Sequence, residues 1–239
     1  MRILGMLWSA LCASVVGLGV AAAMPAEDAA SASPPLRDAR LAEGAVAGIS
    51  QGEWTARWWR WAIGQWIAPY LDPDGRWCAV GQDPDSPVWF LAGTDGTFSP
   101  KRRCVVPEGK YLLVPVINTY FQDSGDAEAE VCAAAQGWVA VNNDQLLSAV
   151  AMLDGRPLGD VRAMRVRSDG CFRFDPEDPS VLSASDGYWL MIAPLPRGRH
   201  TLSIGANYAP GDTGYGGMHQ NFEYTLDIGS EILLSVVAR

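Results

Sequence analysis

Tryptophan is concentrated in one short stretch of this chain, and that stretch constrains the fold more than any other feature. Five of the ten tryptophans fall within residues 51–68, QGEWTARWWRWAIGQWIA. On a helical wheel Trp54, Trp58 and Trp61 share one stripe, and their neighbours widen the apolar arc to about 200°. A helix that is apolar over half of its circumference is typical of a buried helix or of a helix between two layers. The stretch therefore predicts a helix that needs a large apolar surface from the rest of the chain.

An aromatic platform that binds a sugar or a membrane is the alternative interpretation of these residues. Binding aromatics usually lie on loops or strands in twos and threes, whereas this group follows a helical period. We therefore favour a core helix and expect Trp54, Trp58 and Trp61 to be mostly buried. Pro69 and the Asp-Pro-Asp-Gly sequence at residues 72–75 are expected to end the helix.

The N-terminal residues have the pattern of a cleaved signal peptide. Met1-Arg2 gives a short basic start, and an apolar stretch then ends in the small residues Ala21-Ala22-Ala23. This pattern predicts a signal peptide over residues 1–23, with an uncleaved membrane anchor as the alternative. Residues 24–35 are rich in Ala, Ser and Pro and predict a disordered linker. The remaining residues, 36–239, are expected to form a single domain, periplasmic or secreted, without stable insertion in a membrane.

Composition and charge exclude several classes of function. The 239-residue chain is 49% hydrophobic and has a formal net charge of −9. The hydrophobic content is ample for a core and argues against disorder. An acidic surface repels phosphate backbones, so nucleic-acid binding is not expected. The sequence also lacks a P-loop, a dinucleotide fingerprint and, in the mature part, a G-x-S-x-G elbow. No cofactor is expected.

Four cysteines remain after removal of the signal peptide, and they indicate two disulfides. An even number of cysteines is typical of an exported, oxidised domain. Three pairings are possible, and the sequential one, Cys78–Cys104 with Cys132–Cys171, is favoured because it closes the shorter loops. A zinc site is the weaker alternative, since the chain has no C-x-x-C pair and only two histidines. No metal is expected.

Downstream of the tryptophans the pattern changes from helical to strand-like. Apolar runs separated by Gly and Pro predict strands at Val88–Ala92, Lys101–Val106, Tyr111–Asn118, Leu146–Leu153, Val161–Val166, Cys171–Phe174, Tyr188–Ala193, Arg199–Ala206, Phe222–Ile228 and Glu231–Val237. Of these, Leu146–Leu153 and Val161–Val166 are expected to pair as a hairpin around Asp154-Gly155, with a loop longer than two residues.

Two further features refine this prediction. Pro115 lies inside the strongest strand, which indicates an edge position or a bulge. The acid-first segment Asp123–Gln136 predicts a second helix in preference to a calcium cluster. The expected fold is all-β, a β-sandwich of Ig-like or jelly-roll-like type, with the N-terminal Trp-rich helix packed on it.

A series of short motifs appears in order over roughly 150 residues. They are the W-x3-WW-x-W helix at Trp54–Trp61, PVWFLAGT at Pro87–Thr94, R-x-CVVPEGK at Arg102–Lys110, LVPVIN at Leu113–Asn118, LDGRPL at Leu153–Leu158, RVRS at Arg165–Ser168 and DGYWLMIAPLPRGRHTL at Asp186–Leu202. With these motifs the chain resembles an uncharacterised family of exported bacterial proteins. The resemblance implies a secreted domain with a Cys78–Cys104 bond and brings no catalytic residues. The Gly- and Tyr-rich segment Asn207–Gln220 departs from the family pattern.

Candidate binding residues fall in two places. A polar cluster directly follows the strongest strand and consists of Asn118, Tyr120, Gln122 and Asp123. The loop NYAPGDTGYGGMHQN contributes Tyr208, Asp212, Tyr215 and His219. Polar and aromatic loops on a rigid sandwich often carry binding sites, although a solvated insert explains the second group equally well. The other histidine, His200, begins a strand, and a structural role is favoured for it.

Two hypotheses about function follow. The first is a non-catalytic binding module for a glycan or a protein partner at the cell envelope. The alternative is a secreted hydrolase that uses carboxylates or His219. A pair of carboxyl groups about 5–10 Å apart in a concave pocket would favour the hydrolase.

Overall fold

A computed structural model describes residues 40–209 and 217–230. The expected signal peptide, the expected linker and the expected strand Glu231–Val237 lie outside these residues. All of the described residues belong to one compact unit, Pro34–Arg239. Within them, no helix is both long and apolar enough to cross a bilayer.

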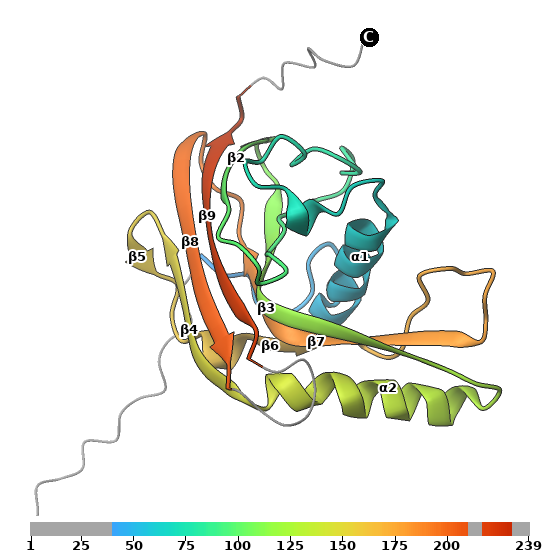
Figure 1. Cartoon of the computed structure of the whole chain (residues 1–239). Helices are drawn as coiled ribbons and strands as arrows, with labels where there is room; N and C mark the ends of the chain where they lie inside the picture. Colours follow the sequence, from blue (N-terminus) through green and yellow to red (C-terminus); the bar gives the residue numbers. More distant parts are fainter. Residues whose placement is uncertain (1–39, 210–216, 231–239) are drawn as a thin grey trace, which may run out of the picture. The chain divides into compact units, whose positions relative to one another are not determined.

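The described residues form two mixed sheets (Figure 1). The four-stranded sheet has the order β1 (Val88–Phe90), β3 (Tyr111–Ser124), β7 (Val181–Ile192), β6 (Arg165–Arg167). The five-stranded sheet has the order β2 (Lys101–Val106), β9 (His219–Ile228), β8 (Gly198–Tyr208), β4 (Leu146–Leu153), β5 (Arg156–Pro157). Each sheet has one parallel pair at an edge, β1–β3 and β2–β9, and its other pairs are antiparallel. The protein is therefore mostly β, consistent with a β-sandwich.

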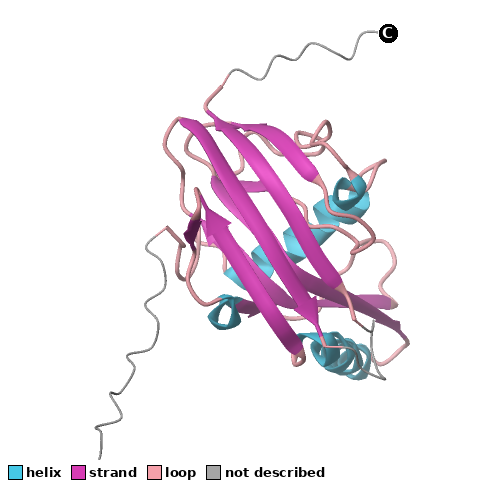
Figure 2. Cartoon of the chain, turned by 60° about the vertical axis from the view of Figure 1, so that its left-hand side comes forward, coloured by secondary structure: helices cyan, strands magenta, loops and turns pink. Residues whose placement is uncertain are grey.

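Helices make up the smaller part of the structure. The α-helices are α1 (Gln51–Gly64) and α2 (Glu128–Asn143), and two short 3-10 helices are η1 (Pro69–Leu71) and η2 (Val161–Met164). Helix α1 lies on the opposite side of β3 from β8 and β9, behind the five-stranded sheet in Figure 2. Helix α2 packs along the far ends of β3 and β7 (Figure 1).

The tryptophan stretch folds into α1 for local reasons and is buried by tertiary ones. Ser50 caps the helix, because its side chain accepts a hydrogen bond from the Glu53 amide at 3.0 Å. Trp54, Trp58 and Trp61 are 2%, 2% and 7% exposed, so they are buried as expected. The polar edge of the helix stays in solvent.

The four-stranded sheet is covered on both faces. One face packs on the five-stranded sheet, in a core that includes Val114 and Leu190 from the first sheet and Leu202 from the second. The opposite face presents Leu113 and Trp189 to the tryptophans of α1. A strand buried on both faces is apolar along its whole length, as LLVPVI in β3 is.

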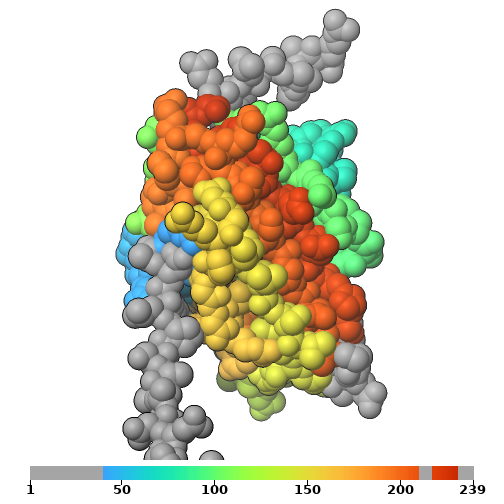
Figure 3. Space-filling model, turned by 90° about the vertical axis from the view of Figure 1, so that its left-hand side faces the viewer, coloured from blue at the N-terminus to red at the C-terminus, as the bar shows by residue number. Residues whose placement is uncertain are grey.

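The outer face of the five-stranded sheet is polar and open to solvent. In β8, Leu202 and Ile204 are buried, whereas Thr201 and Ser203 between and beside them are exposed. Figure 3 looks onto this face, across which β4, β8 and β9 run side by side. A strict alternation of this kind is typical of an antiparallel sheet with one solvated face.

A bulge in β3 changes which residues face α1. The register between β3 and β7 shifts between Pro115 and Ile117, so the structure has the predicted bulge, although β3 is not an edge strand. Before the bulge Leu113 faces α1, and Ile117 already faces the five-stranded sheet. The two faces are thereby exchanged, and after the bulge even-numbered residues, among them Tyr120, face α1.

The expected hairpin around Asp154-Gly155 is wrong in its second arm. Asp154 and Gly155 have φ of 51° and 72°, which suits a tight two-residue turn, and Leu153 pairs directly with Arg156 of β5. Residues 161–164 form η2 instead, and β6 follows it in the other sheet. The sequence prediction failed because the apolar pattern of Leu146–Leu153 and Val161–Val166 does not specify which segment each of them pairs with.

Other boundaries also differ from the expected ones, and β7 begins at Val181, seven residues before the expected Tyr188. The predicted strand Cys171–Phe174 is reduced to a bridge between Phe172 and Ser183. The second helix begins at Glu128, later than predicted, because β3 continues to Ser124 by pairing with β7. The start of α2 therefore depends on how far β3 pairs with β7, which is distant in the sequence.

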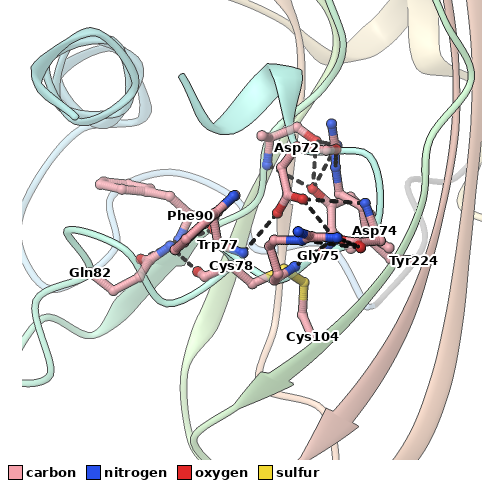
Figure 4. The surroundings of a disulfide bond; sticks show 12 residues. Asp72, Asp74, Gly75, Trp77, Cys78, Gln82, Phe90, Cys104 and Tyr224 are labelled. Atoms are coloured by element: carbon pink, nitrogen blue, oxygen red, sulfur yellow. Dashed lines mark hydrogen bonds and ion pairs between the residues drawn. A yellow bond between two sulfur atoms is a disulfide. The ribbon is translucent and has the colours of Figure 1, made fainter. Parts of the chain in front are cut away.

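Both predicted disulfides are present and the pairing is confirmed. Cys78 bonds Cys104 and Cys132 bonds Cys171, each with Cα atoms 5.7 Å apart. Figure 4 shows the first bond beside the turn at Asp72, whose carboxylate accepts hydrogen bonds from the amides of residues 74, 75 and 77. The second bond joins α2 to the segment that leads into β7.

Candidate functional site

A cavity of about 470 Å³ lies between α1, the middle of β3 and the start of β9. Its size is in the range of small-molecule sites. The residues that line it are Trp58, Trp59, Tyr70, Gly93, Thr94, Asp95, Gly96, Thr97, Asn118, Thr119, Tyr120, Gly217, Met218 and His219. It thus joins part of one predicted polar cluster with part of the other. The first cluster was expected to follow the strand, but it lies inside β3, because pairing with β7 continues to Ser124.

Strand β3 contributes Asn118 and Tyr120 through the bulge described above. In the register of β3 with β7, Asn118 pairs with Gly187. A Cβ atom on Gly187 would lie 2.5 Å from the Cβ of Asn118, so only glycine leaves room for this side chain. Asn118 is 7% exposed, and its Nδ2 is buried without a hydrogen-bond acceptor.

Helix α1 supplies two of the aromatic walls. The Nε1 of Trp58 donates to the Leu91 carbonyl at 2.9 Å, and the Nε1 of Trp59 donates to the Ser185 hydroxyl at 3.0 Å. The ring centroids of Trp59 and Tyr120 are 4.5 Å apart. Because both indole N–H groups are already bonded to protein, the tryptophans offer the cavity their apolar rings.

The loop after β1 forms the polar rim. The Asp95 Oδ1 accepts hydrogen bonds from the amide and the hydroxyl of Thr97 at 2.9 and 2.7 Å, which closes a local turn. The side chain of Gln220, 3% exposed, accepts from the Thr94 amide and donates to the Thr94 carbonyl. The side-chain amide of Gln220 thus makes the two hydrogen bonds to Thr94 that a neighbouring strand would make, and it holds the loop against β9.

A buried guanidinium ties three of the surrounding segments together. Arg102 is 2% exposed and donates to the carbonyls of Tyr70, Ala92 and Gly93 at 2.8–3.2 Å. It also donates to the Tyr224 hydroxyl at 3.0 Å. Arg102 therefore positions Tyr70 and the loop that carries Asp95, although it does not line the cavity itself.

The phenol of Tyr70 lies close to acidic and phenolic groups of the cavity. Burial is the main reason why its pKa is raised above 10.0, and the neighbouring Tyr120 and Asp95 raise it further. Tyr70 therefore stays neutral at physiological pH.

The predicted site residues have different outcomes. Asn118, Tyr120 and His219 line the cavity together. Asp123 lies further along β3, where it pairs with Leu182, and Tyr208 is buried in the core with its hydroxyl bonded to Asn143. Asp212 and Tyr215 lie outside the described residues.

Sequence reasoning missed Tyr70, Asp95 and Thr97 as components of this cavity. They lie in turns and loops between elements, and nothing in their local pattern marks them. An available signal was the Gly-Thr-Asp-Gly-Thr run at residues 93–97, which follows a buried strand directly.

The lining of the cavity combines aromatic rings and uncharged polar groups with one acidic side chain. Of the described residues that line it, Asp95 is the one carboxylate, His219 is the one histidine, and none is lysine or arginine. No group of three or more potential metal ligands occurs in the described part of the chain. A retaining or inverting glycosidase needs two carboxyl groups, which these residues do not supply.

No family model, curated protein or solved structure matches this chain.

Proposed function

We propose that this chain is an exported, disulfide-bonded binding module that takes a carbohydrate residue in the cavity beside α1 without transforming it. The observation that carries the proposal is the pairing of four aromatic side chains with neutral polar groups around one cavity. The aromatic side chains are those of Trp58, Trp59, Tyr70 and Tyr120. A sugar ring has apolar C–H faces and a rim of hydroxyl groups, and it needs both kinds of surface.

Export is supported by the two disulfides, which persist in oxidising compartments, and by the signal-like N-terminal pattern. We place the protein in the periplasm or outside the cell. We also propose that it belongs to the family of exported bacterial proteins whose motifs it resembles.

Binding without catalysis is favoured over hydrolysis because the described residues of the lining include a single carboxylate. Asp95 uses its Oδ1 to hold the turn at Thr97, so this oxygen is committed to structure. The competing hydrolase would rely on His219, which is exposed at the start of β9 and lines the same cavity. The binding module and the hydrolase differ in one observable: a binding module releases the sugar unchanged, and a hydrolase does not.

The test is a titration of the exported, processed protein with a panel of neutral, acidic and amino monosaccharides and oligosaccharides, followed by tryptophan fluorescence. We expect saturable binding of one or more neutral sugars and an unaltered sugar by mass spectrometry. In Tyr120→Leu the binding should weaken at least tenfold, whereas Trp66→Ala, which changes an indole that is 73% exposed, should bind as wild type does.

Two results would count against the proposal. Silence across the whole panel would reject carbohydrate binding. Cleavage products that disappear in His219→Gln would reject a purely binding role and support the hydrolase.

A further inference from the structure

The wall of the cavity carries one accessible negative charge. Asp95 is exposed, and no described residue beside it in the lining is a lysine or an arginine. Its Oδ1 accepts from the amide and the hydroxyl of Thr97, whereas none of the described donors is bonded to its Oδ2. The Oδ2 atom is therefore open to a donor that a ligand brings.

The loop that carries Asp95 is held on both sides of this residue. Thr94 is bonded through its amide and its carbonyl to the side chain of Gln220 on β9. Gly96 lies against the backbone of His219, where an added Cβ would come within 2.9 Å of the His219 carbonyl oxygen. The carboxylate is thus in place before a ligand arrives, which favours affinity.

The charge of Asp95 reaches the aromatic side of the cavity. Tyr70 and Tyr120 line it and are half-buried, so each keeps some accessible surface. Burial is the main cause of the raised pKa of Tyr70, and Tyr120 and then Asp95 add to it, which requires the carboxylate to lie near the phenol. A cation in this part of the cavity would be attracted both by the carboxylate and by the aromatic rings.

This arrangement discriminates between sugars by their charge. An acidic sugar would bring a second negative charge beside Asp95, and the described lining offers it no lysine or arginine. A neutral sugar can give the carboxylate one hydroxyl donor. An ammonium group gives it a charged donor, and charge-assisted hydrogen bonds are roughly twice as strong as neutral ones.

We propose that the preferred ligand is an amino sugar with a free, protonated amine, whose ammonium group donates to the Oδ2 of Asp95 beside the tyrosine rings of the cavity. This inference rests on the proposed carbohydrate function and names the class of sugar that binds most tightly. Neutral sugars occupy the same cavity with lower affinity. Asp95 is the specificity-determining residue.

The experiment compares sugars that differ in the charge of one substituent. Calorimetry in low salt at neutral pH, where most of the amine is protonated, measures the binding of D-glucosamine, D-galactosamine and D-mannosamine. The comparison sugars are the parents D-glucose, D-galactose and D-mannose and the three N-acetyl derivatives, which keep the nitrogen but lose the charge. At least one amino sugar should bind roughly fivefold or more tightly than both its parent and its N-acetyl derivative.

Salt separates a charge effect from a neutral hydrogen bond in the wild-type protein. The preference for the amino sugar should shrink in about 1 M salt, because screening weakens an ion pair that is open to solvent. The affinity for the parent sugar should change little. A preference that is unchanged in salt would overturn the inference without the use of any variant.

Two isosteric variants assign the preference to its residue. Asp95→Asn keeps the Oδ1 acceptor that holds the turn at Thr97 and removes the charge, so the ratio of the affinities should fall toward one while neutral sugars still bind. Asp178→Asn is the matched control. The Asp178 Oδ1 accepts from the amide and the hydroxyl of Ser180 at 3.0 and 2.7 Å, in the same kind of turn, but Asp178 does not line the cavity. This variant loses the same net charge and should keep the preference; circular dichroism checks that both variants fold.

Each outcome decides a different statement. If the amino sugars bind no more tightly than the neutral sugars, this inference fails and the carbohydrate proposal stands. If the preference persists in folded Asp95→Asn, the assignment to Asp95 is wrong, and if Asp178→Asn also loses it, the overall charge is the cause. If no sugar of this set or of the wider panel binds, both proposals fail.

Discussion

Single side chains beside α1 belong to the core and to the cavity at the same time. Trp58 is 2% exposed, and its ring packs edge-on against Trp61 and Trp189 at centroid distances of 5.8 and 5.3 Å. It also lines the cavity next to Trp59. The two interpretations of the tryptophan stretch, core and binding wall, are therefore compatible in this structure.

Removal of one of these rings tests its role in the core. We expect Trp58→Ala to lower the free energy of unfolding by about 3–5 kcal/mol, because a large buried side chain leaves a cavity. Urea denaturation measures the change. Trp66→Ala, at a residue 73% exposed, should cost less than about 1 kcal/mol. A Trp58→Ala protein as stable as wild type would contradict the core assignment.

His200 should make stability depend on pH. Burial lowers its pKa, but the hydrogen bonds to the Asp154 carboxylate, 2.7 Å away, and to the Pro196 carbonyl outweigh this, so its pKa is raised above 6.5. A raised histidine pKa stabilises the folded state fully below the unfolded value and loses that contribution as pH rises through the folded value. The pKa of Asp154 is lowered, so its own contribution is lost only in acid.

The prediction is a pH-dependent difference between wild type and His200→Gln. The difference in unfolding free energy should be largest near pH 5 and should shrink above about pH 6.5. Urea titrations across this range measure it. A constant difference for His200→Gln would rule out the ion pair as the cause.

At the scale of elements, one extra residue in β3 decides what the cavity contains. Successive residues of a strand face opposite sides, so a shift by one residue exchanges the two faces. Because the register changes between Pro115 and Ile117, Asn118 and Tyr120 join Trp59, and Thr119 turns toward α2, where its hydroxyl accepts from Asn143 at 3.0 Å. Strand β7 has no such bulge and keeps Gly187 beneath Asn118.

The contact between β3 and β7 can be tested with one methyl group. Gly187→Ala should destabilise the protein by roughly 1–3 kcal/mol, since the added Cβ meets Asn118 and the Ile117 carbonyl at less than 3.0 Å. Gly137→Ala in α2 is the matched control. Its Cβ meets nothing within 4 Å, so the change should be neutral or stabilising by up to about 1 kcal/mol. Thermal and urea denaturation distinguish the two; equal stabilities would contradict the close packing.

At the scale of the whole described unit, the disulfides join parts that the sheets leave separate. Cys132–Cys171 connects α2 with the segment before β7, across 39 residues. Cys78–Cys104 connects the turn after η1 with β2, across 26 residues. Arg102 lies two residues before Cys104 on β2 and holds the loops around the cavity. The Cys78–Cys104 bond is therefore attached to the same strand as the arginine that positions those loops.

Loss of either disulfide should weaken the fold through the unfolded state. Replacing both cysteines of one pair by serine should lower the free energy of unfolding by about 3–4 kcal/mol, the loop-entropy value for closures of these lengths. Urea denaturation of each double variant measures it. Strong reductant breaks both bonds, so the wild-type protein should then lose about the sum of the two effects. Unchanged stability after reduction would show that the bonds do not constrain the unfolded chain.

The sequence by itself determined the features that depend on local pattern. These are the burial of Trp54, Trp58 and Trp61, the mostly β character and the pairing of the four cysteines. For Pro115 the sequence left an edge position and a bulge as alternatives, and the structure has the bulge. Each is decided by a period, a missing N–H group or a loop length, all of which neighbouring residues specify. Asn118 and Tyr120 were also predicted to belong to a site from the change to polar residues at this point, although they lie inside β3 and not after it.

Only the tertiary structure decided which distant residues meet. Tyr70, Asp95 and His219 come from three segments, and they share a cavity because Arg102 and Gln220 hold the loops in place. The room for Asn118 on β3 depends on Gly187 of β7, some seventy residues away in the chain. Such long-range pairing leaves no trace in local periodicity, because many partners satisfy the same apolar pattern and only the packed core selects among them.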